Sequence, residues 1–278
     1  MQRLSVSEFS SFRWSFFQDV VKLSNLGFGS IGLWRSKVTD YGIEEAADLL
    51  SEMHASVSSL SWAGGFTGSN GVSHKDAIED AIEAVYQAHM VGADKLIVHA
   101  GARNGHTESH AMRLLSGALA QITPIACDLG VTLLLEPISN QRNPWNFLTH
   151  PRQYLELLNE FPESELGLVI DLFHIGRSQQ FADFLPKLAN RIRLVQLSDG
   201  RFAGREFNRC QLGDGIIPVD RWLQLLVDNE YEGEFELELH GPDFELADYG
   251  DVLQKSQHFF NSAMSRTMAT AAKSLNSR

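Results

Sequence analysis

Short apolar runs alternate with longer amphipathic segments along almost the whole chain. Most runs are rich in Val, Ile or Leu, and they are followed by a polar loop and then by apolar residues spaced three and four positions apart. This pattern predicts repeated strand–helix units. The expected strands are Ser30–Trp34, Val57–Trp62, Lys95–Ala100, Val131–Glu136, Gly167–Asp171, Arg193–Asp199 and Phe235–His240, with a weaker one near Arg3.

The amphipathic segments are predicted to be helices. Several end in a glycine just before the next strand, and glycine readily adopts the left-handed conformation that closes a helix. These glycines are Gly27, Gly92, Gly130 and Gly233. Because the strands are mostly unbroken apolar runs separated by helices, we predict a closed parallel (β/α)8 TIM barrel of the α/β class. An open doubly wound sheet is the alternative that this pattern leaves.

The chain has 278 residues, which is within the size range of α/β barrels that fold as a single domain. We expect the barrel to occupy residues 1–263. Residues 264–278 are small and polar, and we expect them to form a C-terminal tail that is helical or disordered.

Composition and charge argue against several classes of partner. The formal net charge of −12 would repel a nucleic-acid backbone. Cys127 and Cys210 do not form a CxxC pair, so we expect neither a disulfide framework nor a thiolate zinc site. No apolar run approaches the length of a membrane span, and the N-terminal residues lack the pattern of a signal peptide. We therefore expect a cytoplasmic protein without nucleic-acid or membrane partners.

Polar side chains occur at the ends of four predicted strands. Glu136 closes one run, Asp171 closes another, and Gln196 and Glu238 interrupt two more. The carboxyl ends of the strands of a parallel barrel surround one mouth, so these side chains should converge there. Glu234 and Glu236 share a face with Glu238 by alternation, but they precede it and should lie deeper in the barrel.

Three converging carboxylates would repel one another, and each is costly to bury without a compensating charge. A divalent cation with oxygen ligands removes that cost, and the carbonyl oxygen of Gln196 can join without adding charge. Glu136, Asp171, Gln196 and Glu238 are therefore predicted to bind one metal ion. Taken singly, a residue of this kind at a strand end is more often a capping or loop-anchoring group than a metal ligand, so the prediction depends on the four together.

Two histidines are further candidates for the site. His174 follows Asp171 by three positions and could bind metal, orient water or contact substrate. His99 ends a predicted strand and is either a substrate-binding group or a packed structural side chain. His106 and His110 flank a helix start and receive no role.

Arginines and tryptophans complete the candidate set. Arg209 precedes a Gly213–Gly215 turn and could clamp a carboxylate, phosphate or hydroxyl group, or merely balance charge; Arg201 and Arg205 are weaker candidates. Tryptophans at or beyond strand ends could form an apolar wall against sugar carbons, or could belong to the core. These are Trp34, which we assign to substrate binding, Trp62 and Trp145.

Together these segments resemble the xylose isomerase-like TIM-barrel superfamily, which includes sugar phosphate isomerases and epimerases. The matching pieces are LLLEPI, GLVIDLFH, RLVQLSDG, LGDGIIPVDRW and GEFELELHG. The resemblance implies one divalent cation, Mn2+, Mg2+ or Co2+, held by a glutamate, an aspartate, a histidine or glutamine, and a second glutamate. Many sugar 3-epimerases have histidine at the third position, whereas Gln196 looks more like the hydroxypyruvate isomerase and 3-dehydroshikimate dehydratase branches. Family members are often dimers or tetramers, so a homo-oligomer is compatible with the resemblance.

The function that follows is a metal-dependent isomerase or epimerase acting on a small sugar or keto acid through a metal-stabilised ene-diolate. Glu136 or Glu238 would remove the proton next to the carbonyl, and the other would return one. His174 and Arg209 would hold substrate oxygens. Loss of a β-hydroxyl from the same intermediate would instead give a dehydratase resembling 3-dehydroshikimate dehydratase.

Two functions of other kinds are alternatives to a metal-dependent isomerase or epimerase. A non-catalytic ligand-binding barrel would keep the fold without turnover. The DNA-repair endonuclease IV family has a similar barrel, but its three-zinc site needs more strand-end histidines and its DNA surface is basic, unlike this acidic chain.

Overall fold

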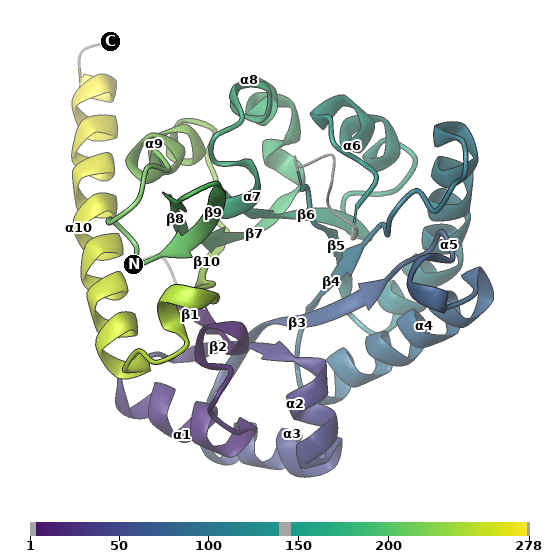
Figure 1. The fold of residues 1–278 in the computed structure, drawn as a ribbon, viewed down its shortest axis with the longest axis horizontal. Coiled ribbons are helices and arrows are strands. Elements are labelled where there is room, and N and C mark those ends of the chain that lie inside the picture. Colours follow the sequence, from purple (N-terminus) through teal and green to yellow (C-terminus); the bar gives the residue numbers. More distant parts are fainter. Residues whose placement is uncertain (1–3, 139–145, 277–278) are drawn as a thin grey trace.

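The computed structural model describes residues 4–138 and 146–276, and its central feature is a closed barrel of parallel strands. Within the described residues, neighbouring strands pair in the order β1-β10-β7-β6-β5-β4-β3-β2 and then back to β1 (Figure 1). The strands are β1 Leu4–Ser7, β2 Ser30–Trp34, β3 Ser56–Gly64, β4 Lys95–His99, β5 Thr132–Leu135, β6 Leu166–Asp171, β7 Ile192–Leu197 and β10 Glu234–Leu237. The predicted barrel is confirmed, and the open sheet is excluded.

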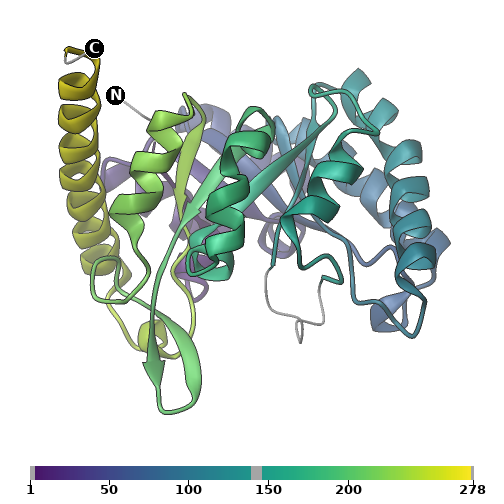
Figure 2. The ribbon, with the colours of Figure 1, turned by 90° about the horizontal axis from the view of Figure 1, so that it is seen from above.

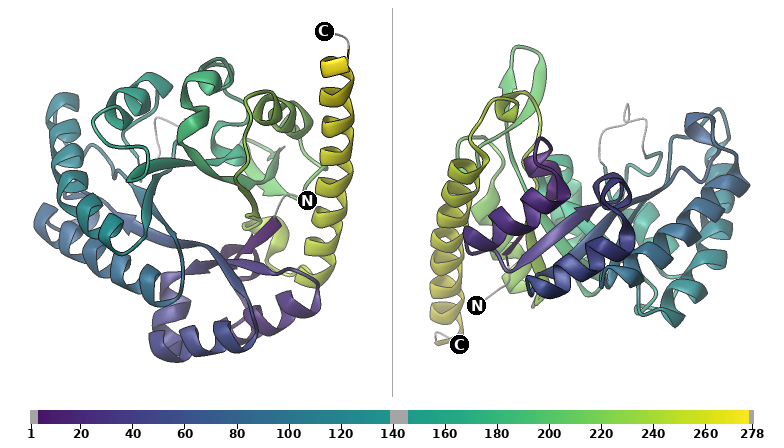
Figure 3. Two further views of the ribbon diagram at one scale, coloured as in Figure 1. Left: turned by 180° about the vertical axis from the view of Figure 1, so that it is seen from behind. Right: turned by 90° about the horizontal axis from the view of Figure 1, so that it is seen from below.

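Helices surround the barrel and cover the outer faces of its strands (Figures 1 and 3). They are α1 Phe16–Asn25, α2 Arg35–Tyr41, α3 Ile43–Glu52, α4 His74–Met90, α5 Glu108–Asp128, α6 Pro151–Leu158, α7 Leu172–Ile175, α8 Gln179–Leu188, α9 Val219–Asp228 and α10 Tyr249–Asn276. The short 3-10 helices are η1 Glu8–Ser11, η2 Ser69–Gly71, η3 Ala189–Arg191 and η4 Pro242–Phe244.

Several helices begin where the sequence provides a capping side chain. Ser15 accepts a hydrogen bond from the backbone N–H of Gln18, whose side chain accepts one from the Ser15 N–H. Ser73 caps α4, Thr107 caps α5 and Ser178 caps α8 through the same kind of side-chain acceptor. These contacts satisfy N–H groups that have no partner inside the helix. Local sequence thus fixes where the chain leaves several barrel loops and starts a helix.

The inside of the barrel is apolar on one side and polar on the other. Four buried side chains from neighbouring strands form an apolar layer: Ile97, Leu134, Val169 and Leu194. On the opposite side the carboxylate of Glu236 is buried among hydroxyl groups, as detailed below. Buried polar groups therefore lie beneath only one side of the barrel mouth.

The segment after β7 forms an antiparallel hairpin. It consists of β8 Asp199–Ala203 and β9 Glu206–Cys210, so the strand predicted over Arg193–Asp199 is wrong at its end and stops at Leu197. The hairpin projects beyond one end of the barrel (Figure 2). Its strands are buried at the base of the hairpin and exposed toward the tip, not at alternate positions, which is why apolar alternation does not reveal it.

The base of the hairpin is tied down by a single carboxylate. Asp199 is buried, and its two oxygens accept hydrogen bonds from the backbone N–H groups of Gly200, Gly213, Gly215 and Ile217 at 2.7–3.1 Å. A Cβ on Gly215 would lie 2.1 Å from an Asp199 carboxylate oxygen, so only glycine fits there. The Gly-Asp-Gly turn is therefore part of the anchor of the hairpin.

Helix α10 runs along the outside of the barrel beside α9 (Figure 1). The residues from Met264 to Asn276, predicted as a helical or disordered tail, continue this helix. Arg266 on α10 forms a 2.8 Å ion pair with Asp220 on α9. The C-terminal end of α10 lies at the opposite end of the barrel from the hairpin (Figure 3). Among the described residues, the helices are all too short or too polar to cross a lipid bilayer.

Replacing Asp199 with alanine is expected to lower the free energy of unfolding by roughly 3 kcal/mol, because four backbone N–H groups, those of Gly200 and Ile217 buried, lose their acceptor. Asp199→Asn keeps one carbonyl oxygen and should lose less. Urea denaturation followed by circular dichroism measures both changes. An alanine variant as stable as the wild type would contradict this anchoring role.

Candidate active site

A cavity of about 360 Å³ lies at the carboxyl ends of the barrel strands, and we call it the mouth cavity. Its lining combines ionisable groups with aromatic and aliphatic side chains. The lining residues are Phe9, Ser61, Trp62, Ile97, His99, Glu136, Ile138, His174, Gln196, Arg209, Glu238 and His240. Such convergence of polar groups within a partly apolar concavity is typical of a small-molecule site.

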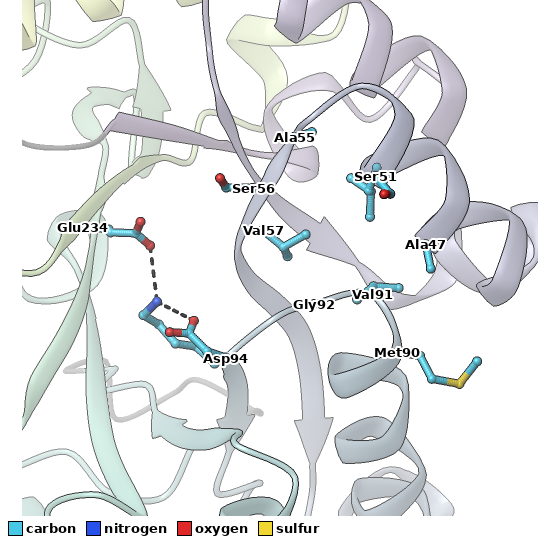
Figure 4. Close-up of a pocket in the computed structure, with 12 residues that line it drawn as sticks. Ala47, Ser51, Ala55, Ser56, Val57, Met90, Val91, Gly92, Asp94 and Glu234 are labelled. Carbon is cyan, nitrogen blue, oxygen red and sulfur yellow. Dashed lines mark hydrogen bonds and ion pairs between the residues drawn. The ribbon is translucent and has the colours of Figure 1, made fainter.

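A second hollow, of about 520 Å³, lies at the opposite ends of the strands (Figure 4). Its charged groups are paired with one another, because the Lys95 ammonium lies 2.7 Å from Asp94 and 3.3 Å from Glu234. Active sites of parallel (β/α)8 barrels lie at the carboxyl ends of the strands, so the smaller mouth cavity is the candidate active site.

Three side chains in and below the mouth cavity could share a cation. Glu136, Asp171 and His174 each offer one ligand atom, and these atoms all lie within 4.8 Å of one another. Asp171 ends β6, His174 follows on α7, and Glu136 directly follows β5. Adjacent strand ends thus bring the three groups together. Two carboxylates and an imidazole are suitable donors for a divalent metal ion.

Arg209 lies between Asp171 and Glu238. From β9 its guanidinium donates hydrogen bonds to Asp171 and, at 3.3 Å, to Glu238 Oε1, and its Nε donates to Ser198 at 3.1 Å. The guanidinium carbon lies 4.3 Å from the centre of the Phe173 ring. Glu238 is therefore joined to the Glu136–Asp171–His174 group through a positive charge delivered by the hairpin.

Gln196 connects the last strand to this cluster. Its Nε2 donates to Glu238 Oε2 at 2.6 Å and to Glu236 Oε1 at 2.9 Å. The register of β6, β7 and β10 aligns Asp171, Gln196 and Glu236 as successive partners across the barrel wall. All four predicted metal ligands thus lie in one connected network of ion pairs and hydrogen bonds.

The two glutamates at the mouth have opposite pKa shifts. Burial alone would raise the pKa of Glu136, but the hydrogen bond and charge of His99, with His174 and Arg209, lower it to about 2. Burial, reinforced by Asp171 and Glu136, raises the pKa of Glu238 to about 7 despite the attraction of Arg209. Two carboxyl groups of one cavity therefore prefer different protonation states.

The profile of the xylose isomerase-like TIM barrel family matches residues 20–263. The chain belongs to this family. Among curated proteins, an uncharacterized protein of Methanocaldococcus jannaschii is 25% identical over 167 residues, which are 59% of this chain. The match spans 55% of that relative's own length, so it carries no conclusion about the activity of the whole protein.

Solved structures of similar fold include two with informative names. The IolI protein with a bound zinc atom has a TM-score of 0.83 at 17% identity, covering 96% of this chain and 99% of its own. L-ribulose 3-epimerase has a TM-score of 0.80 at 17% identity, covering 98% and 97%. At this level of identity the likeness shows only that this chain shares the fold of these two proteins.

Histidines and aromatic rings form the sides of the mouth cavity. His99 Nε2 lies 2.6 Å from Glu136 Oε2, and the His99 ring stacks on Trp62 with centroids 5.1 Å apart. His240 Nε2 lies 3.6 Å from Glu238 Oε1, and burial lowers the pKa of His240 to about 3. His240 is therefore a neutral polar group beside Glu238.

Not every predicted substrate-binding residue reaches the cavity. Trp34 is not among the described lining residues, and its ring packs on Phe9, which does line the cavity, with centroids 5.0 Å apart. Arg201 pairs with Asp243 at 2.8 Å on the exposed hairpin, and Arg205 is exposed. Trp145 lies outside the described residues.

Several residues of the site have no role in the sequence-based prediction, among them His240, Phe9 and Glu236. His240 follows Glu238 by two positions, so strand alternation could have placed it on the same face. Phe9 follows the weakest predicted strand and offers no polar signal. Glu236 is correctly predicted to lie deeper than Glu238, but its contact with Gln196 depends on the register of two strands distant in sequence.

Burial raises the pKa of Glu236 from 4.5 to about 7. Because the folded state holds this proton more tightly than the unfolded chain, the associated stability is present below pH 4.5 and is lost as the pH rises to about 7. In EDTA, the wild type should therefore lose about 3 kcal/mol relative to Glu236→Gln over this range. Urea denaturation of both proteins at several pH values measures the difference, and a constant difference would contradict the shift.

Proposed function

We propose that this protein is a divalent-metal-dependent isomerase or epimerase acting on a small polyhydroxylated carbonyl compound. The observation that carries the proposal is the pair Glu136 and Glu238, which line one cavity from strands separated by β6 and β7. Moving a hydrogen between neighbouring carbons, or between the faces of one carbon, needs groups that accept and return a proton. Two glutamates approaching from different strands meet that need.

The residues that would hold the cation are Glu136, Asp171, Gln196 and Glu238, with His174 adjoining. Their donor set fits Mn2+, Mg2+ or Co2+, since it is rich in oxygen and its three carboxylates carry more negative charge than Arg209 alone offsets. When bound, such a cation polarises a carbonyl oxygen and thereby acidifies the neighbouring C–H bond.

The side chains of the cavity would position the substrate. Arg209 and His174 carry N–H groups suited to carbonyl and hydroxyl oxygens, and His240 adds a neutral imidazole beside Glu238. Trp62 and Phe9 offer apolar faces for carbon-bound hydrogens and exclude water from the glutamates. The cavity volume of about 360 Å³ suits a compound of monosaccharide size rather than a polymer.

Relatives of the same fold support this class of chemistry. One similar structure is named as an L-ribulose 3-epimerase and another as a 3-keto-D-glucoside 4-epimerase from E. coli, and the similar IolI protein holds a zinc atom. Epimerisation next to a carbonyl and isomerisation share the same first proton transfer.

A metal-dependent dehydratase is the second candidate, and two features favour it. Gln196 occupies the third ligand position, and Arg209 stands just before a Gly-Asp-Gly turn that Asp199 anchors. Both features resemble the 3-dehydroshikimate dehydratase branch. Loss of a β-hydroxyl after the same proton removal separates this reaction from isomerisation, so a product assay distinguishes the two.

Protein stripped with EDTA and reloaded with Mn2+, Mg2+ or Co2+ is expected to catalyse incorporation of solvent deuterium next to the carbonyl. A panel of ketoses including L-ribulose, together with 3-dehydroshikimate, is followed by NMR in D2O. A new epimer or isomer supports the first candidate, and loss of water supports the dehydratase. Metal binding with no exchange or turnover of any compound would favour a non-catalytic binding barrel and contradict the proposal.

Replacing either glutamate with glutamine should slow turnover at least about 100-fold, because a proton acceptor is lost. Glu136→Gln and Glu238→Gln are the test variants. Glu232→Gln, which changes an exposed glutamate near the start of β10, is the matched control and should retain full activity. Steady-state rates under saturating metal measure the effect, and full activity in both test variants would contradict the assigned roles.

A further inference from the structure

Glu236 is a fully buried carboxylate inside the barrel for which the proposed reaction has no use. One oxygen, Oε2, accepts hydrogen bonds from the hydroxyls of Ser58 at 2.7 Å, Ser59 at 3.1 Å and Ser5 at 3.5 Å. The other oxygen, Oε1, accepts from Gln196 Nε2 at 2.9 Å. The two oxygens thus have separate partners, with hydroxyl donors on one side and an amide donor on the other.

The barrel wall is shaped to admit this carboxylate. A Cβ on Gly32 of β2 would lie 2.1 Å from Glu236 Oε2, so any larger residue at this position would force the side chain away. Strand register pairs Glu236 with Gln196 directly. Burying the Glu236 carboxylate costs desolvation free energy, and its hydrogen bonds offset that cost only in part.

Both hydrogens of the Gln196 amide are used. Nε2 donates to Glu236 Oε1 and to Glu238 Oε2 at 2.6 Å, and among the described residues no donor reaches Gln196 Oε1. Gln196 lines the mouth cavity. A carboxamide group can rotate by about 180° and exchange the positions of its nitrogen and oxygen with almost no change in shape. Its hydrogen-bond partners therefore determine which of the two atoms faces a ligand. Two carboxylates can accept only from the nitrogen.

We propose that Glu236 is a positioning residue that fixes the Gln196 amide so that its carbonyl oxygen is presented to the metal. This inference rests on the metal site of the proposed function. A metal ion binds the oxygen of an amide and is repelled by its NH2 group. A carboxylate ligand needs no such control because its two oxygens are equivalent. A glutamine ligand must be held with its oxygen toward the metal, and Glu236 holds Gln196 in this orientation from the neighbouring strand.

The variant Glu236→Gln is expected to reverse the orientation of the Gln196 amide. The hydroxyls of Ser58 and Ser59 still require an acceptor, so the carbonyl oxygen of the new amide faces them and its NH2 group faces Gln196. Gln196 must then turn its own oxygen inward and its NH2 group toward the cation. At pH 8 the variant should bind Mn2+ about 10- to 100-fold more weakly than the wild type, as measured by calorimetry.

The exchange variant Glu236→Gln/Gln196→Glu separates orientation from charge. In it the NH2 group at position 236 donates to a carboxylate at position 196, whose second oxygen remains for the metal. Starting from Gln196→Glu, the change Glu236→Gln should therefore maintain or raise Mn2+ affinity, although it lowers affinity in the wild-type background. If charge alone mattered, the same change would lower affinity by a similar factor in both backgrounds, and this result would overturn the proposal.

Two further readouts keep the test decisive. Melting temperatures in EDTA establish that each variant folds. In the wild type, carbon-13 NMR of labelled glutamine should show a shift of the Gln196 carboxamide carbon on addition of Mg2+. Both Nε2 protons should remain, because the metal binds the oxygen. No response at saturation would also overturn the proposal. Failure of the wild type to bind any divalent cation would remove the proposed function itself, whereas binding without the reversal between backgrounds removes only the role of Glu236.

Discussion

The compensation of buried negative charge at the mouth of the barrel is the constraint on which the other features depend. Glu136, Asp171 and Glu238 are all nearly inaccessible to solvent, and isolated carboxylates in that position would be strongly destabilising. Arg209 bridges two of them, and His99 contacts the third. A cation bound among these side chains would compensate the negative charge that Arg209 and His99 leave.

This constraint links the hairpin to the site. Arg209 arrives from β9, outside the barrel proper, so its guanidinium can reach Asp171 only if the base of the hairpin is fixed. Asp199 provides that fixed point through four backbone hydrogen bonds. The Gly-Asp-Gly turn therefore acts on the site at a distance, through the placement of one arginine. On the other side, Glu236 and Gln196 connect the barrel interior to the same cavity.

The sequence predicts the barrel and the convergence of strand-end side chains, because apolar runs and glycine-ended helices carry a strong periodic signal. Asp171 and Gln196 are predictable since the last positions of parallel strands share one mouth. The hairpin is not predictable in this way, because its buried and exposed positions do not alternate and its strands pair through their backbones. The position of Trp34 on Phe9, rather than on the cavity, depends on side-chain packing that strand periodicity does not encode.

The most direct measurement is a titration of the metal-free protein with Mn2+, following the signal of free Mn2+ by electron paramagnetic resonance. Saturable binding of one ion is predicted for the wild type and for Glu232→Gln. Asp171→Asn, which weakens the centre of the Glu136–Asp171–His174 group, should reduce the affinity by at least about 10-fold. A wild-type protein without a saturable site, or an Asp171→Asn variant with unchanged affinity, would contradict a metal centre at the mouth of this barrel.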